Sequence, residues 1–222
     1  MQTIESDPSP EVYQGQFGTF TITDRDRQGV VVYRSALMVA AISFGIATLA
    51  MLLSSSQIED GSGSQVSNLV TWLYITFSVA LGVALATIHI YMAILHRVLQ
   101  VFWAIGCVNA IGLAVYYHQP IGEVIYRQPL TILGIGFTFA ALTGIFFKEA
   151  FCFDRLETKI LVPIVPLLLI GHLTKLLPIS IKAILLAIWA GAFLVFAVRK
   201  AIQPIPPDIG DKSVFTYLEM QK

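Results

Sequence analysis

Residues 69–117 read LVTWLYITFSVALGVALATIHIYMAILHRVLQVFWAIGCVNAIGLAVYY, an almost uninterrupted apolar run. At a rise of about 1.5 Å per residue, a single helix of this length would be more than twice as long as the roughly 30 Å hydrocarbon layer of a bilayer is thick. The run must therefore contain two membrane crossings. His96 and Arg97 are the polar pair at which we expect the chain to turn.

The same length rule divides the rest of the chain outward from this run. It gives six apolar segments, at about 35–53, 69–95, 98–117, 130–147, 160–177 and 181–198. The composition agrees, because 56% of the 222 residues are hydrophobic and 13% are charged, which is atypical of a soluble domain. We predict an all-α polytopic membrane protein: a six-helix transmembrane domain at 35–198, with short polar segments at 1–34 and 199–222.

The distribution of Lys and Arg predicts the orientation. Alternate sides of the six segments hold eleven and three of these residues, and the side with eleven includes both terminal segments and the stretch 148–159. By the positive-inside rule, both termini face the cytoplasm. The fourteen basic residues are balanced by fourteen acidic ones, so nucleic acid is not an expected partner.

Both polar ends carry local signals. Alternation from Phe17 to Thr23 predicts a short strand, and Thr23 with Asp26 has the spacing of a capping box from which a helix can enter the membrane. The tail from Arg199 is predicted to be extended at its three prolines and then to form a helical turn with Phe215 and Leu218. We expect both ends to lie on the bundle or on another subunit.

Small residues recur every four positions in three segments, so that each set lies on one helix face. Close backbone approach drives helix association in lipid, and we interpret these stripes as packing seams rather than as a glycine-lined conduit. The stripes are Gly106/Ala110/Ala114, Gly136/Ala140/Gly144 and Ala183/Ala187/Gly191.

Polar residues at membrane depth are costly and are therefore the candidates for function. His89 and His172 are candidate ligands of a tetrapyrrole metal, in haem or chlorophyll, and the alternative is that each is a hydrogen-bonded packing residue. His89 and His96 are predicted to share one face of the second helix. Asn109 is expected to bond to a neighbouring helix, and Lys175 and Lys182 to anchor helix ends at the interface.

The most distinctive string, FKEAFCFDRLETK at Phe147–Lys159, alternates aromatic and charged residues. It predicts an amphipathic bridge at the cytoplasmic interface, in which the aromatic rings enter the bilayer and the polar side chains face water or one another. Its candidate functional residues are Lys148, Glu149, Cys152, Asp154, Arg155 and Glu157.

The sequence favours no catalytic function. The string at Phe147–Lys159 has no histidine to serve as a base for Cys152, and the two cysteines, Cys107 and Cys152, have no metal-ligand spacing. Phosphate-binding, zinc-protease, nucleophile-elbow and dinucleotide motifs are absent from the sequence, and GSGS at 61–64 is interpreted as a linker. We therefore expect no catalytic residue and no metal site.

YRSALMVAAISFGIATL at Tyr33–Leu49 and the string at Phe147–Lys159, in a chain of six segments, resemble a family of cyanobacterial and plastid-related integral membrane proteins known as a domain of unknown function. The resemblance runs from about Tyr13 to Arg199. It implies a photosynthetic organism and a thylakoid or plasma membrane, and it assigns no catalytic residue.

Three functions follow as hypotheses. The first is an accessory subunit or assembly factor that packs against other subunits of a photosynthetic or respiratory complex, because the exposed ends are short and the small-residue seams are plentiful. The second is a small-solute carrier or channel, because Pro163 and Pro166 interrupt the fifth segment. The third is a tetrapyrrole-binding bundle.

Overall fold

The computed structural model describes residues 11–54, 64–90 and 92–220. Most of the predicted polar loop after the first segment, including the interpreted linker at 61–63, and the first ten residues lie outside this range. The described chain contains six helices that are long and apolar enough to cross a membrane, which confirms the all-α polytopic prediction. These are α1 (Asp24–Leu53), α3 (Ser64–Thr87), α4 (Ala93–Tyr117), α6 (Ile132–Phe153), α7 (Leu156–Thr174) and α8 (Ile179–Ile202).

The first helix starts earlier than the apolar run predicts. Thr23 is its N-cap, and the Thr23 Oγ1 and Asp26 side chains satisfy each other's backbone N–H groups, as the capping-box spacing predicts. The helix then continues without a break into the apolar run. This agrees with the predicted capped lead-in, because the charged first turn and the apolar segment that begins at about residue 35 belong to one helix.

The turn inside the quoted run was also placed wrongly. α3 ends at Thr87 and α4 begins at Ala93, so His96 and Arg97 lie inside α4 and His89 lies in the connection, not on a helix face shared with His96. The reason is that the end of α3 is capped from α4. His96 Nε2 bonds to the carbonyl of Leu85, and Gln100 Nε2 approaches the same oxygen at 3.4 Å.

Pro163 and Pro166 do not interrupt the fifth crossing. α7 is continuous from Leu156 to Thr174 with both prolines inside it. In lipid, a helix tolerates proline where neighbouring helices and local adjustments satisfy the freed backbone groups. The two prolines therefore do not create the broken helix that the transport hypothesis was based on.

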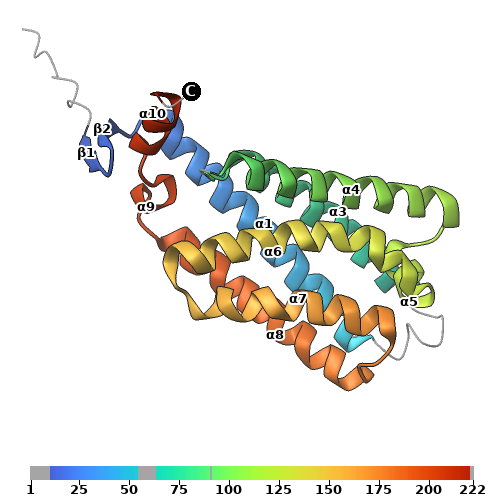
Figure 1. The fold of residues 1–222 in the computed structure, drawn as a ribbon. Coiled ribbons are helices and arrows are strands. Elements are labelled where there is room, and N and C mark those ends of the chain that lie inside the picture. Colours follow the sequence, from blue (N-terminus) through green and yellow to red (C-terminus); the bar gives the residue numbers. More distant parts are fainter. Residues whose placement is uncertain (1–10, 55–63, 91, 221–222) are drawn as a thin grey trace, which may run out of the picture.

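The helices form two connected groups (Figure 1). In one group α1 packs along α3 and α8, and in the other α6 packs along α4 and α7. The contact between α7 and α8 joins the two groups. Short segments complete it: α5 (Ile121–Arg127) and the 3-10 turn Pro129–Thr131 lie between α4 and α6. β1 and α10, the first and last described elements, lie at the same end of the bundle, which we call the terminal end, and the opposite end is the distal end.

The chain before and after the helices folds together at the terminal end. Antiparallel strands β1 (Val12–Gly15) and β2 (Gly18–Thr21) form a hairpin, of which the sequence predicted only the second strand. In the tail, α9 (Pro206–Ile209) replaces part of the predicted extended proline segment, and α10 (Ser213–Met220) confirms the predicted helical turn at residues 215 and 218.

Asp211, between α9 and α10, holds the turn of the hairpin. Its carboxylate accepts a hydrogen bond from the N–H of Gln16 at 2.6 Å, and the Ser213 hydroxyl accepts one from Phe17 at 3.1 Å. The hydrogen bonds from Ser213 and Gln16 hold the pKa of Asp211 below its usual range. Gly15 permits this approach, because a Cβ there would lie 2.1 Å from Asp211 Oδ1.

The small-residue stripes differ in what they contact. An added Cβ on Gly106 would lie 2.1 Å from Thr138 Oγ1, and one on Gly144 would lie 2.1 Å from Leu99, so α4 and α6 approach closely at both points. Ala110 is buried, and Ala114 packs on the same small cluster. On α6, Gly136 is in ordinary contact with Leu169 of α7, and Ala140 is half-buried.

The stripe on α8 differs from the expectation of a seam within the bundle. Ala183 is half-buried, whereas Ala187 and Gly191 are exposed, and no atom lies within 4 Å of a Cβ added to Gly191. α8 packs inward through another face instead, with Trp189, Phe193 and Phe196 buried.

Asn109 also differs from its prediction. Its side-chain amide donates to the carbonyl of Ile105 in its own helix at 2.8 Å, rather than to a neighbouring helix. Its side chain nevertheless lies against α6, because a Cβ on Gly134 would lie 2.5 Å from Asn109 Oδ1.

Replacing Gly106 by alanine should separate α4 from α6. We expect Gly106→Ala to lower the free energy of unfolding by about 1–3 kcal/mol, because overpacking forces neighbouring side chains or backbone to move. Thermal unfolding in detergent measures the effect. Gly112→Ala is the matched control in the same helix, since nothing lies within 4 Å of a Cβ there. Equal stability of the two variants would contradict the close approach.

Candidate functional site

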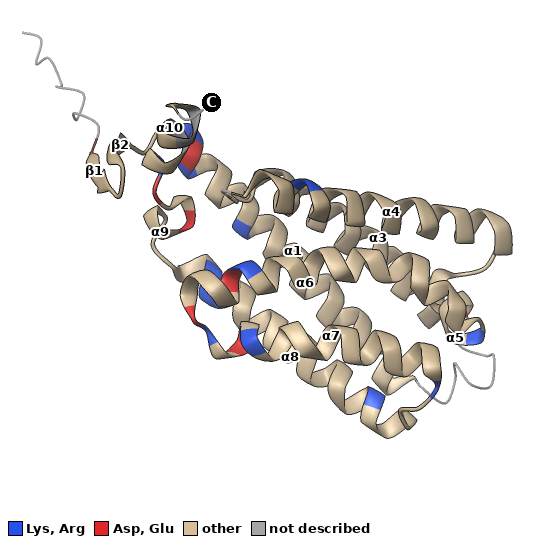
Figure 2. Cartoon of the chain, viewed as in Figure 1, with Lys and Arg blue, Asp and Glu red and all other residues tan. Residues whose placement is uncertain are grey.

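Charged residues gather at the terminal end, while the middle parts of the long helices are nearly free of them (Figure 2). At the centre is Lys200 near the end of α8, which is fully buried. Its ammonium bonds to Glu149 Oε2 of α6 at 2.6 Å and to Asp208 Oδ1 of α9. It also lies 4.1 Å from the centroid of the Phe153 ring, a cation–π contact. One buried cation thus joins two helices and the tail.

Arg34 extends this terminal charge cluster to α1. Its Nε and Nη2 donate to Asp208 Oδ2 at 2.8 and 2.6 Å, and its other donors reach the carbonyls of Gln203 and Pro204. The Gln203 side chain also donates to Asp208 at 3.1 Å. Asp208 therefore pairs with two cations, and its burial is compensated by hydrogen bonds.

The string at Phe147–Lys159 forms the end of α6, a tight turn and the start of α7, rather than a bridge on the interface. Asp154 takes the left-handed conformation at the end of α6, and Arg155 is the N-cap of α7. Glu149 and Glu157 are buried instead of facing water, and Glu149 pairs with Lys148 of the same string, which is the other arrangement that the sequence allowed. The reason is that each has a cation from α8, Lys200 and Arg199 respectively.

The remaining candidates in this string have separate surroundings. Lys148 bonds to Glu149 at 2.9 Å, Asp154 pairs with Lys159 on the exposed surface, and Arg155 bonds to the side chain of Gln203. Cys152 is exposed. Because nearly all the charged groups here are engaged with one another, we interpret this terminal charge cluster as a structural joint rather than as a reactive centre.

His89 lies near this cluster, in the connection between α3 and α4. A Cβ on Gly29 of α1 would lie 3.5 Å from its ring. Burial lowers the pKa of His89, and the carboxylate of Asp26 acts in the opposite direction. His172 lies in the last turn of α7, at the distal end. The two candidate ligands therefore lie at different ends of the bundle, each in its own surroundings.

The distal half of the bundle contains a chamber of about 840 Å³. Its wall is formed by α1, α3, α5, α6, α7 and α8, and the lining side chains are overwhelmingly apolar. The volume lies within the range of about 300–1,000 Å³ that is typical of small-molecule sites, which are likewise mainly apolar with few polar groups. This distal chamber is the candidate functional site.

The floor of the chamber is a packed aromatic cluster. The rings of Phe44 and Trp189 lie with their centroids 4.4 Å apart, Phe139 and Trp189 are 5.3 Å apart, and Phe77 and Phe139 are 5.6 Å apart. These rings come from α1, α3, α6 and α8, so the floor is fixed by four helices at once. Such a floor offers apolar contact area and few polar groups to a bound molecule.

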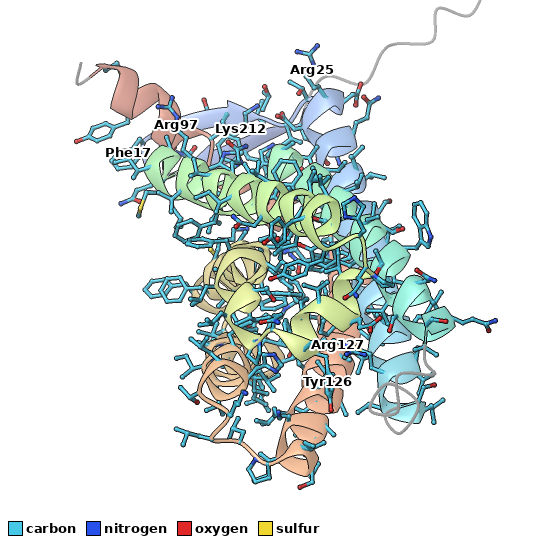
Figure 3. All side chains as sticks on the ribbon, turned by 90° about the vertical axis from the view of Figure 1, so that its right-hand side faces the viewer. Phe17, Arg25, Arg97, Tyr126, Arg127 and Lys212 are labelled. Atoms are coloured by element: carbon cyan, nitrogen blue, oxygen red, sulfur yellow. The ribbon has the colours of Figure 1, made fainter. Side chains whose placement is uncertain are left out.

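α5 is attached to both sides of the chamber. The N–H of Ile121 donates to Thr71 Oγ1 of α3 at 3.0 Å, and His172 Nε2 of α7 lies 3.2 Å from the carbonyl of Ile125. Figure 3 views the bundle from its distal side and places Tyr126 and Arg127 of α5 over its middle. His172 therefore has a hydrogen-bonded role in tying α5 to α7, the alternative that the sequence left open beside metal ligation.

The mouth of the chamber carries positive charge. Lys175, the C-cap of α7, and Lys182, in the first turns of α8, both line it together with His172. In the part of the chain that the structure describes, no Asp or Glu lines the chamber. The lysines and the aromatic floor together give the chamber one charged and one apolar region.

Three polar residues of the chamber could be selected from the sequence, but the chamber itself could not. His172 was singled out as a candidate ligand, and Lys175 and Lys182 as interfacial anchors. The aromatic floor was missed, because Phe44, Phe77, Phe139 and Trp189 come from separate helices and no spacing in the sequence connects them.

Removing the buried cation should destabilise the terminal end. Lys200→Met leaves Glu149 and Asp208 without their shared partner, and breaking a buried pair typically costs about 3–5 kcal/mol in the free energy of unfolding. Lys159→Met is the control, since its exposed pair with Asp154 is worth about 0–1 kcal/mol. Unfolding in detergent measures both variants, and adding Glu149→Gln to Lys200→Met should recover part of the loss. Equal losses for Lys200→Met and Lys159→Met would refute the joint.

A comparison with known families places the chain. The family model described as "uncharacterized integral membrane protein (DUF2301)" matches residues 83–217, from near the C-terminal end of α3 to α10. No curated protein and no solved structure matches the chain. The match covers more than half of the sequence and agrees with the six apolar spans. The chain is thus a multi-pass integral membrane protein and belongs to the DUF2301 family.

Proposed function

We propose that this protein is a non-enzymatic membrane protein that binds a long-chain apolar molecule in the distal chamber. The observation that carries the proposal is the chamber of about 840 Å³ with its aromatic floor. Filling this partly open apolar chamber with water would leave apolar side chains in contact with water, which is unfavourable. A lipid-like chain from the bilayer supplies apolar contacts without the cost of burying polar groups.

The lining of the chamber and the unbroken α7 support the binding of an apolar molecule over the transport of a small polar solute. A polar solute needs hydrogen-bond partners along its route, whereas the side chains here are mainly aliphatic and aromatic. The unbroken α7 provides no discontinuous-helix site of the kind common in transporters.

Two further features are proposed from the sequence. The Lys and Arg distribution supports an orientation in which the terminal end faces the cytoplasm and the chamber opens in the opposite half of the bilayer. The resemblance at Tyr33–Leu49 and Phe147–Lys159 supports a photosynthetic source and a thylakoid or plasma membrane.

As a second function we propose that the protein is an accessory or assembly subunit that packs against another membrane protein through α8. The supporting observation is the exposed stripe at Ala187 and Gly191, which presents small residues away from the bundle. In lipid, stripes of this kind permit close helix approach.

Binding in the chamber is tested with a brominated fatty acid methyl ester, because bromine quenches tryptophan fluorescence on contact. In a Trp72→Phe/Trp103→Phe background, the remaining Trp189 reports on the floor. We expect saturable quenching that Ala183→Phe weakens at least about tenfold, since its ring occupies space in the chamber; this corresponds to about 1.4 kcal/mol. Ala187→Phe, one turn away on the exposed face of the same helix, should bind like the parent protein. Quenching that does not saturate, or that is equal in both variants, would contradict the proposal.

The same two substitutions test the accessory role in the reverse sense. Purification from native membranes in mild detergent should retain a stoichiometric partner with Ala183→Phe and lose it with Ala187→Phe, because only the latter alters the exposed stripe. Recovery of the same partner with both variants would remove α8 as the interface. Recovery of the parent protein alone would remove the accessory role.

A further inference from the structure

The mouth of the distal chamber contains two lysines at one edge. Lys175 ends α7 in the left-handed conformation, with φ of 57°, and α8 begins at Ile179 after a tight turn through Pro178. This turn brings Lys175 and Lys182 from two helices to the lining of the same chamber.

These lysines differ from the other lysines of the described chain. Lys148, Lys159, Lys200 and Lys212 each pair with a carboxylate within 4 Å. In residues 11–54, 64–90 and 92–220, no such pair forms at Lys175 or Lys182, and no acidic residue lines the chamber. Two positive charges at an apolar opening thus lack a counter-charge from the described protein.

From this charge pattern we infer that the molecule bound in the chamber is a long-chain carboxylate, whose head group is held between Lys175 and Lys182 while its chain lies on the aromatic floor. The inference rests on the proposed function and specifies the chemistry of its ligand. Charge-assisted hydrogen bonds from ammonium to carboxylate are about twice as strong as neutral ones. They are stronger where water is partly excluded than in bulk water, because the effective dielectric constant is lower.

The two lysines lie close together along the chain. Three residues, 176–178, separate Lys175 from the start of α8, and Lys182 follows in the first turns of that helix. Long lysine stems also allow the ammonium groups to follow a head group at the membrane interface.

His172 has a structural role at the mouth and is not assigned to the binding of the head group. Its Nε2 faces the carbonyl of Ile125, which fixes the ring beside the mouth and holds α5 against α7. The head group is therefore assigned to the two lysines, whose donors are not taken up by a carboxylate of the described chain.

The competing explanation is that Lys175 and Lys182 are only interfacial anchors for α7 and α8. An anchor stabilises the helix ends but does not distinguish a charged ligand from a neutral ligand of the same chain length. The ratio of the affinities for an acid and its ester separates the two explanations.

The experiment compares a brominated fatty acid with its methyl ester at pH 8, again with Trp189 as reporter. We expect the parent protein to prefer the acid by about tenfold, as hydrogen bonds between charged groups imply. Lys175→Gln/Lys182→Gln should bring the ratio close to one while leaving binding of the ester intact. The preference should also fall with added salt, because the mouth is reached by solvent.

Lys159→Gln/Lys212→Gln is the control, since it removes two positive charges from the terminal end and should retain the preference. Saturable binding of the ester with no preference for the acid, or an equal preference in both double variants, would overturn the head-group assignment while the proposed function stands. Absence of saturable quenching by either ligand would overturn the proposed function itself.

Discussion

The structure depends on the burial of one ammonium group between two carboxylates. Lys200 is withdrawn from solvent, and a charge in that position is tolerated only if partners and hydrogen bonds replace water. Glu149 and Asp208 supply them, and Asp208 in turn requires Arg34. These ion pairs hold α1, α6, α8 and the tail together at the terminal end, independently of the apolar contacts along the helices.

The two ends of the bundle therefore differ in how they are held. At the terminal end, ion pairs and the hairpin contact with Asp211 connect segments far apart in the sequence. At the distal end, the helices meet through an aromatic floor and through α5, which is bonded to α3 and α7. A chamber is compatible with a stable bundle because the interactions that close the fold are concentrated at the other end.

The candidate site was predictable in its chemistry but not in its geometry. Single polar residues in long apolar helices are conspicuous, so His172, Lys175 and Lys182 could be selected from the sequence. Glu149 could be selected too, but not its burial, because its partner Lys200 lies in another helix, 51 positions away. The turn was misplaced at His96 for a related reason: a polar side chain can cap a neighbouring helix from within its own.

The sequence by itself determined that the described chain has six segments long and apolar enough to cross a membrane and that its first helix begins with a capping box, since length, hydropathy and local hydrogen bonding are properties of single segments. Only the tertiary structure decided which small residues lie at contacts, which charges are buried and where the helices leave space. Gly106 and Gly191 look equivalent in sequence, yet one lies against Thr138 and the other faces outward. That difference arises because neighbouring helices set the rotation of a helix about its axis. The sequence of one helix does not specify this rotation.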